Sequence, residues 1–296
     1  MNNQTMIERD MNKISRKQRV VKAIVLILLY TFLAIMALSV LFPFYWMIIS
    51  SLKNMDEYYA STPTFFPTQG IAWSNYSKAF EATNLLQLFL NTVYVGIVST
   101  VLSLIITVLT AFVFARLEFK GKNVLFAALL ATMMIPGELF TITNYQTVNA
   151  FGWTNTFSVL IIPFLVSVFY IYLLRQNFLQ IPNELYLAAK VDGTSDLKYL
   201  WKVMVPLALP TLISITILKM MGAWNSYMWP QLVARDDLHK LITNGLRTAQ
   251  FAVVDGYPDY PTQMAAIVLV SLPLFLVFVF LRKYIMKGVS RSGIKG

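Results

Sequence analysis

The sequence predicts an all-α membrane protein with six transmembrane helices. Hydrophobic residues occupy 57% of the 296 positions and charged residues only 13%, and the mean hydropathy is +0.61. Soluble domains carry about 25% charged residues, so this composition is typical of a chain that crosses a membrane. The apolar residues gather in six stretches, each close to the ~20 residues that a helix needs to cross the hydrocarbon core.

The basic residues are divided unevenly between the two sides of such a bundle. Six spans place both termini, the turn at 116–122 and a polar segment at 181–206 on one side. With the arginines that flank these segments, that side holds 18 of the 24 Lys and Arg residues. The remainder are Lys53, Lys78, Lys219, Arg235, Lys240 and Arg247. Because cytoplasmic loops are enriched in Lys and Arg, the asymmetry predicts cytoplasmic termini. It also explains the net charge of +10 without a nucleic-acid partner.

Residues 1–22 are expected to form a polar cytoplasmic tail, followed by a membrane domain at 23–284. A basic start before an apolar run also occurs in signal peptides. However, no charged residue lies between Ala23 and Leu52, and this run is too long for a signal peptide. We therefore predict the first span at 23–48, with a bend near Pro43.

The loop at 49–85 is polar but rich in aromatic residues: Tyr58, Tyr59, Phe65, Phe66, Trp73 and Tyr76. Such rings are typical of the membrane–water interface. Docking of an external partner is the alternative explanation.

Five further spans follow this loop, and the pattern of apolar residues predicts their bounds: 86–115, 123–142, 157–179, 206–230 and 262–281. Within the third span of the chain, the Pro136-Gly137 pair is expected to kink or end the helix. The stretches 144–156 and 231–261 are predicted to be loops. The chain ends in a basic tail at 285–296.

The polar segment 181–206 predicts two short helices. Pro182 suits a first helical turn, where its missing N–H is not needed, and Glu184 favours the positive end of that helix. One helical face then carries Leu185, Ala188 and Ala189. Gly193 can end the helix in a left-handed conformation.

The second helix of this segment is expected to be capped by Thr194, with Asp196 in its first turn. Its apolar residues recur at i, i+3, i+4 and i+7, which indicates an amphipathic helix: Leu197, Leu200, Trp201 and Met204. Pro206 closes the segment. Two helices that meet at a glycine could dock into a groove of another protein, and a simple connector between spans explains the same residues equally well.

The sequence contains no catalytic or metal-binding motif. It has no cysteine and only His239, which excludes disulfides, thiolate sites and metal sites built from several histidines. Gly121-Lys122 lacks the preceding glycine and the following Ser or Thr of a nucleotide-binding loop. The predicted spans offer almost no polar catalytic groups. We therefore expect a membrane protein that is not an enzyme and has no cofactor of its own.

Lys219 is the one basic residue deep in a predicted span. An ammonium group at the membrane centre costs about 2.5–3.5 kcal/mol, so it is expected to face the bundle interior, a partner subunit or a watery cavity. A lysine whose stem reaches the interface is the alternative. Further pore or substrate candidates lie near the outer ends of spans: Trp224, Asn225, Tyr227 and Glu138. The rings and amide suit a sugar, although an interfacial position explains them as well.

The polar segment resembles a cytoplasmic motif of permease subunits in binding-protein-dependent ABC importers. That motif reads Glu-Ala-Ala, three residues, Gly, nine residues, then Ile-x-Leu-Pro. Here the spacing is the same, with Leu187-Ala188-Ala189, Gly193 and Val203-Met204-Val205-Pro206. The stretches NELYLAAKVDG, MMIP, WNSYMWP and SGIKG are similar to the maltose-type carbohydrate permeases, above all the shorter six-span subunit. The resemblance spans nearly the whole chain.

This resemblance implies a type I ABC importer permease fold with a cytoplasmic coupling helix pair between spans 4 and 5. The implied coupling residues are Glu184, Leu187, Ala188, Ala189, Asp192, Gly193 and Pro206. The implied partners are a second homologous permease, a dimer of ATPase subunits that holds ATP and Mg²⁺, an external sugar-binding protein and the lipid bilayer. The implied location is the cell (inner) membrane of a bacterium or archaeon.

Leu187 departs from the family pattern, in which a glutamate usually stands at this position and is thought to pair with a basic residue of the ATPase. Glu184 or Asp192 could replace it, or the partner permease could carry the polar contact. The implied substrate is an oligosaccharide. The alternatives are an anionic glycan, a glycerol-phosphate-type substrate, or a secondary transporter or channel without an ATPase.

Overall fold

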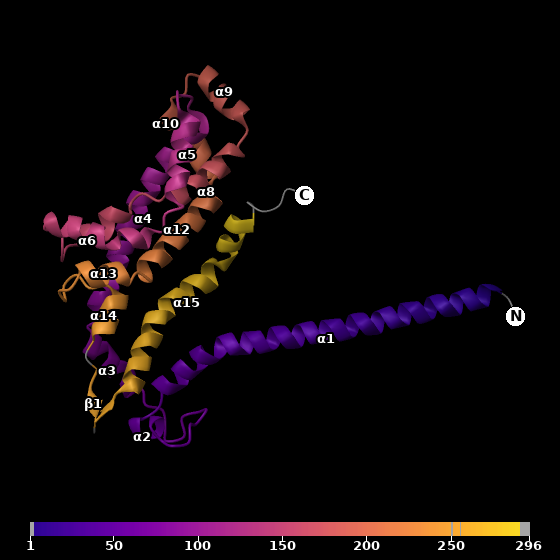
Figure 1. Ribbon diagram of the computed structural model, residues 1–296, viewed down its shortest axis with the longest axis vertical. Helices are drawn as coiled ribbons and strands as arrows, with labels where there is room; N and C mark the ends of the chain where they lie inside the picture. The colour runs from indigo at the N-terminus through magenta and orange to yellow at the C-terminus, as the bar shows by residue number, and fades with distance from the viewer. Residues whose placement is uncertain (1–2, 250, 255, 291–296) are drawn as a thin grey trace. The chain divides into compact units, whose positions relative to one another are not determined.

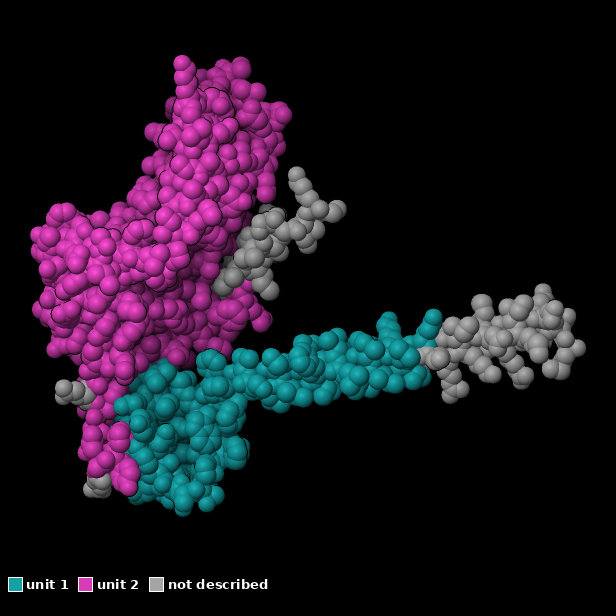
Figure 2. Space-filling view, in the orientation of Figure 1, with its two compact units in different colours: residues 1–75, 259–268 teal, residues 76–258, 269–296 magenta. Residues whose placement is uncertain are grey.

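The computed structural model describes residues 3–249, 251–254 and 256–290. Almost all of this part of the chain with regular structure is helical (Figure 1). The strands within it, β1 (Val253–Val254) and β2 (Tyr257–Pro258), form a small antiparallel pair. The chain divides into two compact units, residues 1–75 with 259–268 and residues 76–258 with 269–296 (Figure 2).

The smaller unit begins with α1 (Asn3–Ser51), a single helix that contains the predicted first span. Within Val20–Ser51, an 18-residue stretch has a mean hydropathy of 2.8, which suits a membrane crossing. The polar tail predicted at 1–22 is therefore helical from Asn3 onward, and Pro43 lies inside the helix. The unit also includes α2 (Met55–Tyr58) and the first residues of α3 (Ser74–Thr83) and α15 (Tyr260–Ser290).

A buried carboxylate organises residues 52–73, which we call the Glu57 loop. Glu57 is only 2% exposed. It accepts hydrogen bonds from Thr64 Oγ1 (2.7 Å), from Thr68 N and Oγ1 (2.8 and 2.9 Å), and from Gln69 N (3.2 Å). Burial by itself would raise the pKa of Glu57, but these donors favour the charged form and lower the pKa to about 2. The loop is thus a folded structure, whereas the sequence predicted a polar loop with interfacial aromatic rings and gave no sign of a buried carboxylate.

The larger unit is built around α4 (Leu85–Arg116), which packs against α8 (Val168–Leu179) and α12 (Leu209–Trp224). Its buried core joins these helices through Phe112, Leu174, Phe178 and Ile215. At the other end of α4, Leu88 lies against Gly245, where an added Cβ would stand 2.3 Å from a Leu88 methyl group. A larger residue at position 245 would therefore force the Leu88 side chain to move.

The remaining helices of this unit connect or flank these three: α5 (Lys122–Thr132), η1 (Gly137–Phe140), α6 (Thr141–Ala150), α7 (Phe157–Ile161), η2 (Ile162–Phe164), α9 (Asn183–Val191), α10 (Asp196–Tyr199), the π-helical η3 (Leu200–Met204), α11 (Val205–Leu207), α13 (Met228–Val233) and α14 (Ile242–Thr248).

By length and composition, the described part of the chain has three helices that could each cross a membrane, or up to six if bent pairs count as single spans. The three single helices are Val20–Ser51, Leu85–Arg116 and Tyr260–Phe280. The bent pairs are Lys122–Thr132 with Gly137–Ala150 (80°), Phe157–Phe164 with Val168–Leu179 (46°), and Asp196–Leu207 with Leu209–Trp224 (80°). The structure thus has a helical architecture in which up to three of the six candidate spans are broken.

Several predicted boundaries differ from the structure. The span predicted at 123–142 is broken where the kink was expected: α5 ends at Thr132, and the next helical part begins at Gly137 after Pro136, at an angle of 80°. The stretch 144–156, predicted as a loop, begins as part of helix α6, whose polar residues are mostly exposed. The predicted loop 231–261 contains α14 and the strand pair. In the tail predicted at 285–296, residues up to Ser290 belong to α15 and residues 291–296 lie outside the described residues.

Candidate functional site

The polar segment 181–206 folds as the predicted helical hairpin, and we call it the hairpin. It lies at one end of the larger unit, whereas α13 and α14 lie toward the opposite end (Figure 1). Its first helix, α9, follows Pro182, has Glu184 in its first turn and stops before Gly193. Gly193 has φ +68°, which confirms the predicted left-handed end.

The turn at Gly193 is a Schellman motif. Gly193 N donates to Lys190 O at 3.0 Å, and Thr194 N donates to Ala189 O at 2.9 Å. The next helix is capped by Ser195, whose Oγ accepts from Lys198 N at 3.4 Å, so the predicted cap at Thr194 is wrong. Thr194 instead supplies the backbone N–H that closes the preceding helix.

The second arm of the hairpin runs through α10, η3 and α11, with Pro206 inside α11. The predicted apolar face is divided in two: Leu200 and Met204 are buried, whereas Leu197 and Trp201 are exposed. The π-helical stretch explains this division, because its wider turn changes the angle between successive residues relative to an α-helix.

An internal polar cluster holds the two arms together. Asp196 Oδ1 accepts from Tyr186 Oη at 2.8 Å and pairs with Lys190 Nζ at 2.7 Å. The hydrogen bond from Lys190, followed by the one from Tyr186, lowers the pKa of the Asp196 carboxyl. The Tyr186 ring also packs on Tyr199 with centroids 5.1 Å apart. The hairpin is therefore a preformed shape.

The outside of the hairpin exposes apolar side chains. Leu187 is 56% exposed and Val191 is 88% exposed, and Leu185, Leu197 and Trp201 are also exposed. Ala188 is exposed beside them, Ala189 is half-buried, and the carboxylates Glu184 and Asp192 lie on the exposed surface as well. Leu187, in the place of the family's usual glutamate, thus adds to an apolar surface. A large exposed apolar patch with a polar rim is typical of a protein-binding surface.

Buried arginine anchors the base of the hairpin to α4. Arg116 Nη2 donates to Phe178 O at 2.9 Å and to Ile181 O at 2.5 Å, and the residue is 8% exposed. Arg175 Nε donates to Phe114 O at 3.0 Å in the same region. From the sequence, Arg116 is merely one more basic residue at the end of an apolar run. In the structure, this arginine joins the hairpin to α4, the longest helix of the larger unit.

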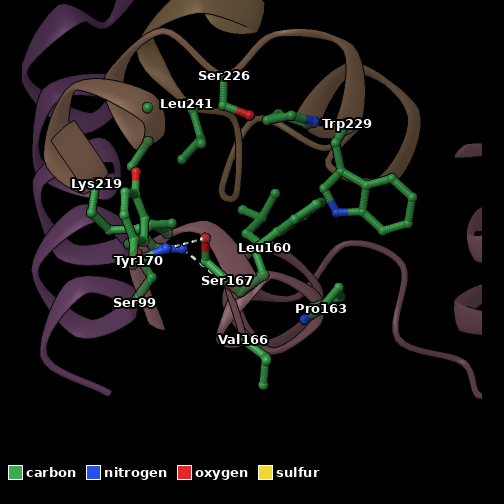
Figure 3. Close-up of a pocket in the computed structure, with 15 residues that line it drawn as sticks. Ser99, Leu160, Pro163, Val166, Ser167, Tyr170, Lys219, Ser226, Trp229 and Leu241 are labelled. Carbon is green, nitrogen blue, oxygen red and sulfur yellow. Dashed lines mark hydrogen bonds between the residues drawn. The ribbon is translucent and has the colours of Figure 1, made fainter. Parts of the chain in front are cut away.

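A second candidate site is a cavity of about 380 Å³ in the larger unit, which we call the Lys219 pocket (Figure 3). Its polar side chains come from α4, α8, α12 and the segment after α12: Ser99, Ser167, Tyr170, Lys219 and Ser226. Its apolar walls include Leu160, Pro163, Phe164, Trp229 and Leu241. The volume falls in the range of about 300–1,000 Å³ that is usual for small-molecule sites.

Lys219 is half-buried in this pocket, as the sequence predicted for a lysine deep in a span. Its Nζ donates to Phe164 O at 2.5 Å. Phe164 ends η2, just before the break in the bent pair. Its carbonyl therefore lacks the backbone N–H that a following helical turn would offer. Trp229, which lies in the same aromatic stretch as the sequence candidates Trp224 and Tyr227, lines the pocket and donates from Nε1 to Val159 O at 2.9 Å.

The other predicted pore residues do not line this pocket. Trp224 is buried against Phe89, with ring centroids 5.6 Å apart. Asn225 is exposed and donates to Met221 O at 2.9 Å, and Tyr227 is exposed. Glu138 lies exposed in η1. Ser226 and Trp229 line the pocket instead, because the chain turns after Trp224, between α12 and α13.

No cluster of metal-binding side chains occurs among the residues that the structure describes. The two candidate sites differ in chemistry: the hairpin exposes apolar side chains, and the Lys219 pocket is lined by hydroxyl groups and one ammonium.

Comparison with known proteins identifies the family. Residues 103–291 match the family described as "Binding-protein-dependent transport system inner membrane component". The chain is 29% identical to the arabinooligosaccharides transport system permease protein of Halalkalibacterium halodurans, over 89% of this chain and 94% of that protein. It is also 29% identical to the trehalose/maltose transport system permease protein of Thermococcus litoralis, over 88% and 94% of the two chains.

A solved structure has the same fold. This chain is similar to one from a bacterial ABC transporter involved in the import of the acidic polysaccharide alginate, with a TM-score of 0.79 and 25% identity. The match covers 87% of this chain and 95% of that one. The fold, the family match and the relatives agree with the resemblance seen in the sequence. The chain belongs to the family of inner membrane components of binding-protein-dependent transport systems, and it is a membrane permease rather than an enzyme.

Proposed function

We propose that this chain is the transmembrane subunit of an ATP-driven importer of sugars and that it forms half of the translocation pathway with a second, homologous permease. The relatives support a sugar substrate, because their names refer to arabinooligosaccharides, diacetylchitobiose and lactose. Family membership favours ATP-driven import over a secondary transporter or channel.

The observation that carries the proposal is the shape of the hairpin. Its two arms are fixed to each other by Tyr186, Lys190 and Asp196, while its apolar side chains are exposed. A preformed knob binds with a smaller loss of conformational entropy than a flexible loop. We infer that it docks into a cleft of a cytoplasmic ATPase dimer, which would hold ATP and Mg²⁺.

Each predicted coupling residue has a place in this docking. Leu187 and Ala188 would contact the cleft directly, with Ala189 supporting them, and Gly193 and Pro206 would set the directions of the arms. Glu184 and Asp192 are exposed carboxylates close to Leu187. They would supply the polar contact that a glutamate at 187 makes in other family members.

The anchoring of the hairpin provides a route for mechanical work. Arg116 binds carbonyl groups at the end of α8 and the start of the hairpin, so a displacement of the hairpin would move α4 as well. Closure of the ATPase dimer on ATP would then rock the spans from an inward-facing to an outward-facing arrangement. This is a rigid-body transition of the kind that packed helices support.

The distribution of charge supports the orientation of this assembly. The hairpin and both termini would lie in the cytoplasm of a bacterial or archaeal cell, because their side holds most of the Lys and Arg residues. The loops at 49–85 and 231–261 would then contact an external sugar-binding protein. The basic tail at 285–296 would reach the ATPase pair.

Co-purification tests the docking. In a complex expressed with its own ATPase, Ala188→Trp places a large ring in the centre of the exposed knob and should reduce the recovered ATPase roughly tenfold, equivalent to ~1.4 kcal/mol. Lys120→Trp is the matched control, because it adds the same ring at an exposed position in the turn after α4. Undiminished recovery with Ala188→Trp would show that the hairpin is not the coupling surface.

A further inference from the structure

We propose that the Lys219 pocket binds a carboxylate of the transported sugar, so that this importer accepts an acidic oligosaccharide. The proposal rests on the proposed function and names its substrate class. It concerns a different part of the chain from the hairpin and can fail independently of it.

The pocket contains a positive charge that the chain does not neutralise. Among the described residues, the ion pairs involve other cations, and no Asp or Glu lines the pocket. The one contact of Lys219 Nζ is the carbonyl of Phe164, which uses one of three N–H donors. A carbonyl offers a dipole but no compensating charge. A ligand carboxylate would supply that charge, and charge-assisted hydrogen bonds are the stronger kind.

The other polar groups of the pocket suit the rest of an acidic sugar. Ser167 Oγ accepts from Tyr170 N at 3.4 Å, so its hydroxyl hydrogen stays available to a ligand. Tyr170 and Ser226 bring further hydroxyl groups to the same cavity, as Figure 3 shows, and Ser99 Oγ, which donates to Gly96 O at 3.3 Å, can still accept. Hydroxyl groups both donate and accept, which matches the hydroxyl groups of a sugar as well as a second carboxylate oxygen.

The apolar walls favour a sugar over a small inorganic anion. Trp229, Phe164 and Pro163 line the cavity with apolar surface, against which the C–H groups of a sugar ring can pack. An inorganic anion would gain nothing from such walls. The combination of rings, hydroxyl groups and one ammonium is therefore best matched by a sugar that carries a carboxylate.

A purely structural role for Lys219 makes a different prediction. In that case the ammonium would only satisfy the Phe164 carbonyl at the broken span. That task needs a donor but no charge. A neutral donor at position 219 therefore separates the two roles.

The test measures the affinities of the assembled complex for digalacturonate and for the neutral digalactose of the same linkage. Both are measured in nanodiscs at low salt. The native complex should prefer digalacturonate. Lys219→Met and Lys219→Gln should reduce the ratio of the two affinities roughly tenfold, and Lys219→Arg should restore it to within about threefold. Lys120→Met removes an exposed lysine outside the pocket and should leave the ratio unchanged.

Four outcomes would overturn the proposal: a native ratio in Lys219→Gln, an equal loss for both sugars in Lys219→Met, no native preference for the acid, or binding of neither sugar. The ATPase recovered with the native hairpin is measured on the same preparation. Because it reports on the coupling surface alone, failure of the pocket proposal is distinguishable from failure of the proposed function.

Discussion

The hairpin and the Glu57 loop both depend on a carboxylate, but they use it in opposite ways. In the Glu57 loop the carboxylate is buried and receives four hydrogen bonds from the loop itself. In the hairpin Asp196 is partly exposed, and it pairs with a lysine whose side chain is 46% exposed. The first carboxylate forms the centre of a fold, and the second fastens two helices that already exist.

This difference indicates what each region is built to do. The Glu57 loop does not need a partner to hold its shape, because its buried carboxylate is hydrogen-bonded within the loop. The hairpin satisfies its backbone with a Schellman turn and a serine cap, and it leaves its apolar side chains exposed. Docking would bury these side chains and add to the stability of the hairpin.

The largest effect is expected from Glu57→Gln. The amide cannot accept all four hydrogen bonds, because its NH2 group would face a donor of the loop in place of a carboxylate oxygen. Leaving buried groups unsatisfied costs about 1–3 kcal/mol each, so we expect the loop to lose about 3 kcal/mol of local stability. Hydrogen exchange of residues 57–69 in the assembled complex would measure the loss. Asp56→Asn is the control, because Asp56 is the exposed neighbour and should change exchange by less than about 0.5 kcal/mol.

Acid gives an independent measurement of the same interaction. The pKa of Glu57 is lowered from 4.5 to about 2 in the folded loop. A lowered pKa stabilises the fold fully above the unfolded value, and this contribution disappears as the pH falls from 4.5 through 2. Pepsin cleavage of residues 59–69 should therefore rise steeply over this range in the native protein. In Glu57→Gln it should be high throughout, and equal profiles would contradict the role of the carboxylate.

Features that depend on neighbouring residues could be predicted from the sequence, whereas features that depend on residues far apart in the chain could not. Gly193 and the amphipathic spacing are local signals, and the hairpin agrees with them. The cap at Ser195 rather than Thr194 was missed because both residues can cap, and the Schellman turn needs the N–H of Thr194. Helix α6 was missed since its Asn, Thr and Gln residues are typical of loops, although they lie on an exposed helix surface.

The pocket shows the same limit more clearly. Lys219 was found because a charge within a span is conspicuous. Ser99, Tyr170 and Ser226 lie far from it in the sequence and carry no local signal, so only the packing of α4, α8 and α12 brings them together. Glu57 was missed for a related reason, since its partners at 64, 68 and 69 are ordinary loop residues.

A smaller effect is expected from Gly193→Val, which changes the hairpin without removing any exposed side chain. No atom lies within 4 Å of an added Cβ, so the cost comes from the backbone at φ +68°. A left-handed L-residue costs about 1–2 kcal/mol, and a β-branched one falls at the upper end. We expect faster hydrogen exchange at 189–199 and weaker ATPase recovery. Gly193→Asn tolerates this conformation and should lose less than about 1 kcal/mol. Equal losses in Gly193→Val and Gly193→Asn would show that the effect comes from side-chain contacts and not from the left-handed backbone.

The smallest effect is expected from Asp196→Asn, and it bears most directly on the comparison. The variant keeps an acceptor for Tyr186 but loses the charge that pairs with Lys190. Partly exposed ion pairs contribute about 0.2–1 kcal/mol, so hydrogen exchange at 183–199 should change by no more than that and should approach the native rate in high salt. A loss as large as that of Glu57→Gln would mean that the hairpin, too, is organised around its carboxylate. The hairpin would then be a polar fold of the same kind as the Glu57 loop, and its exposed apolar side chains would need another explanation than a preformed docking surface.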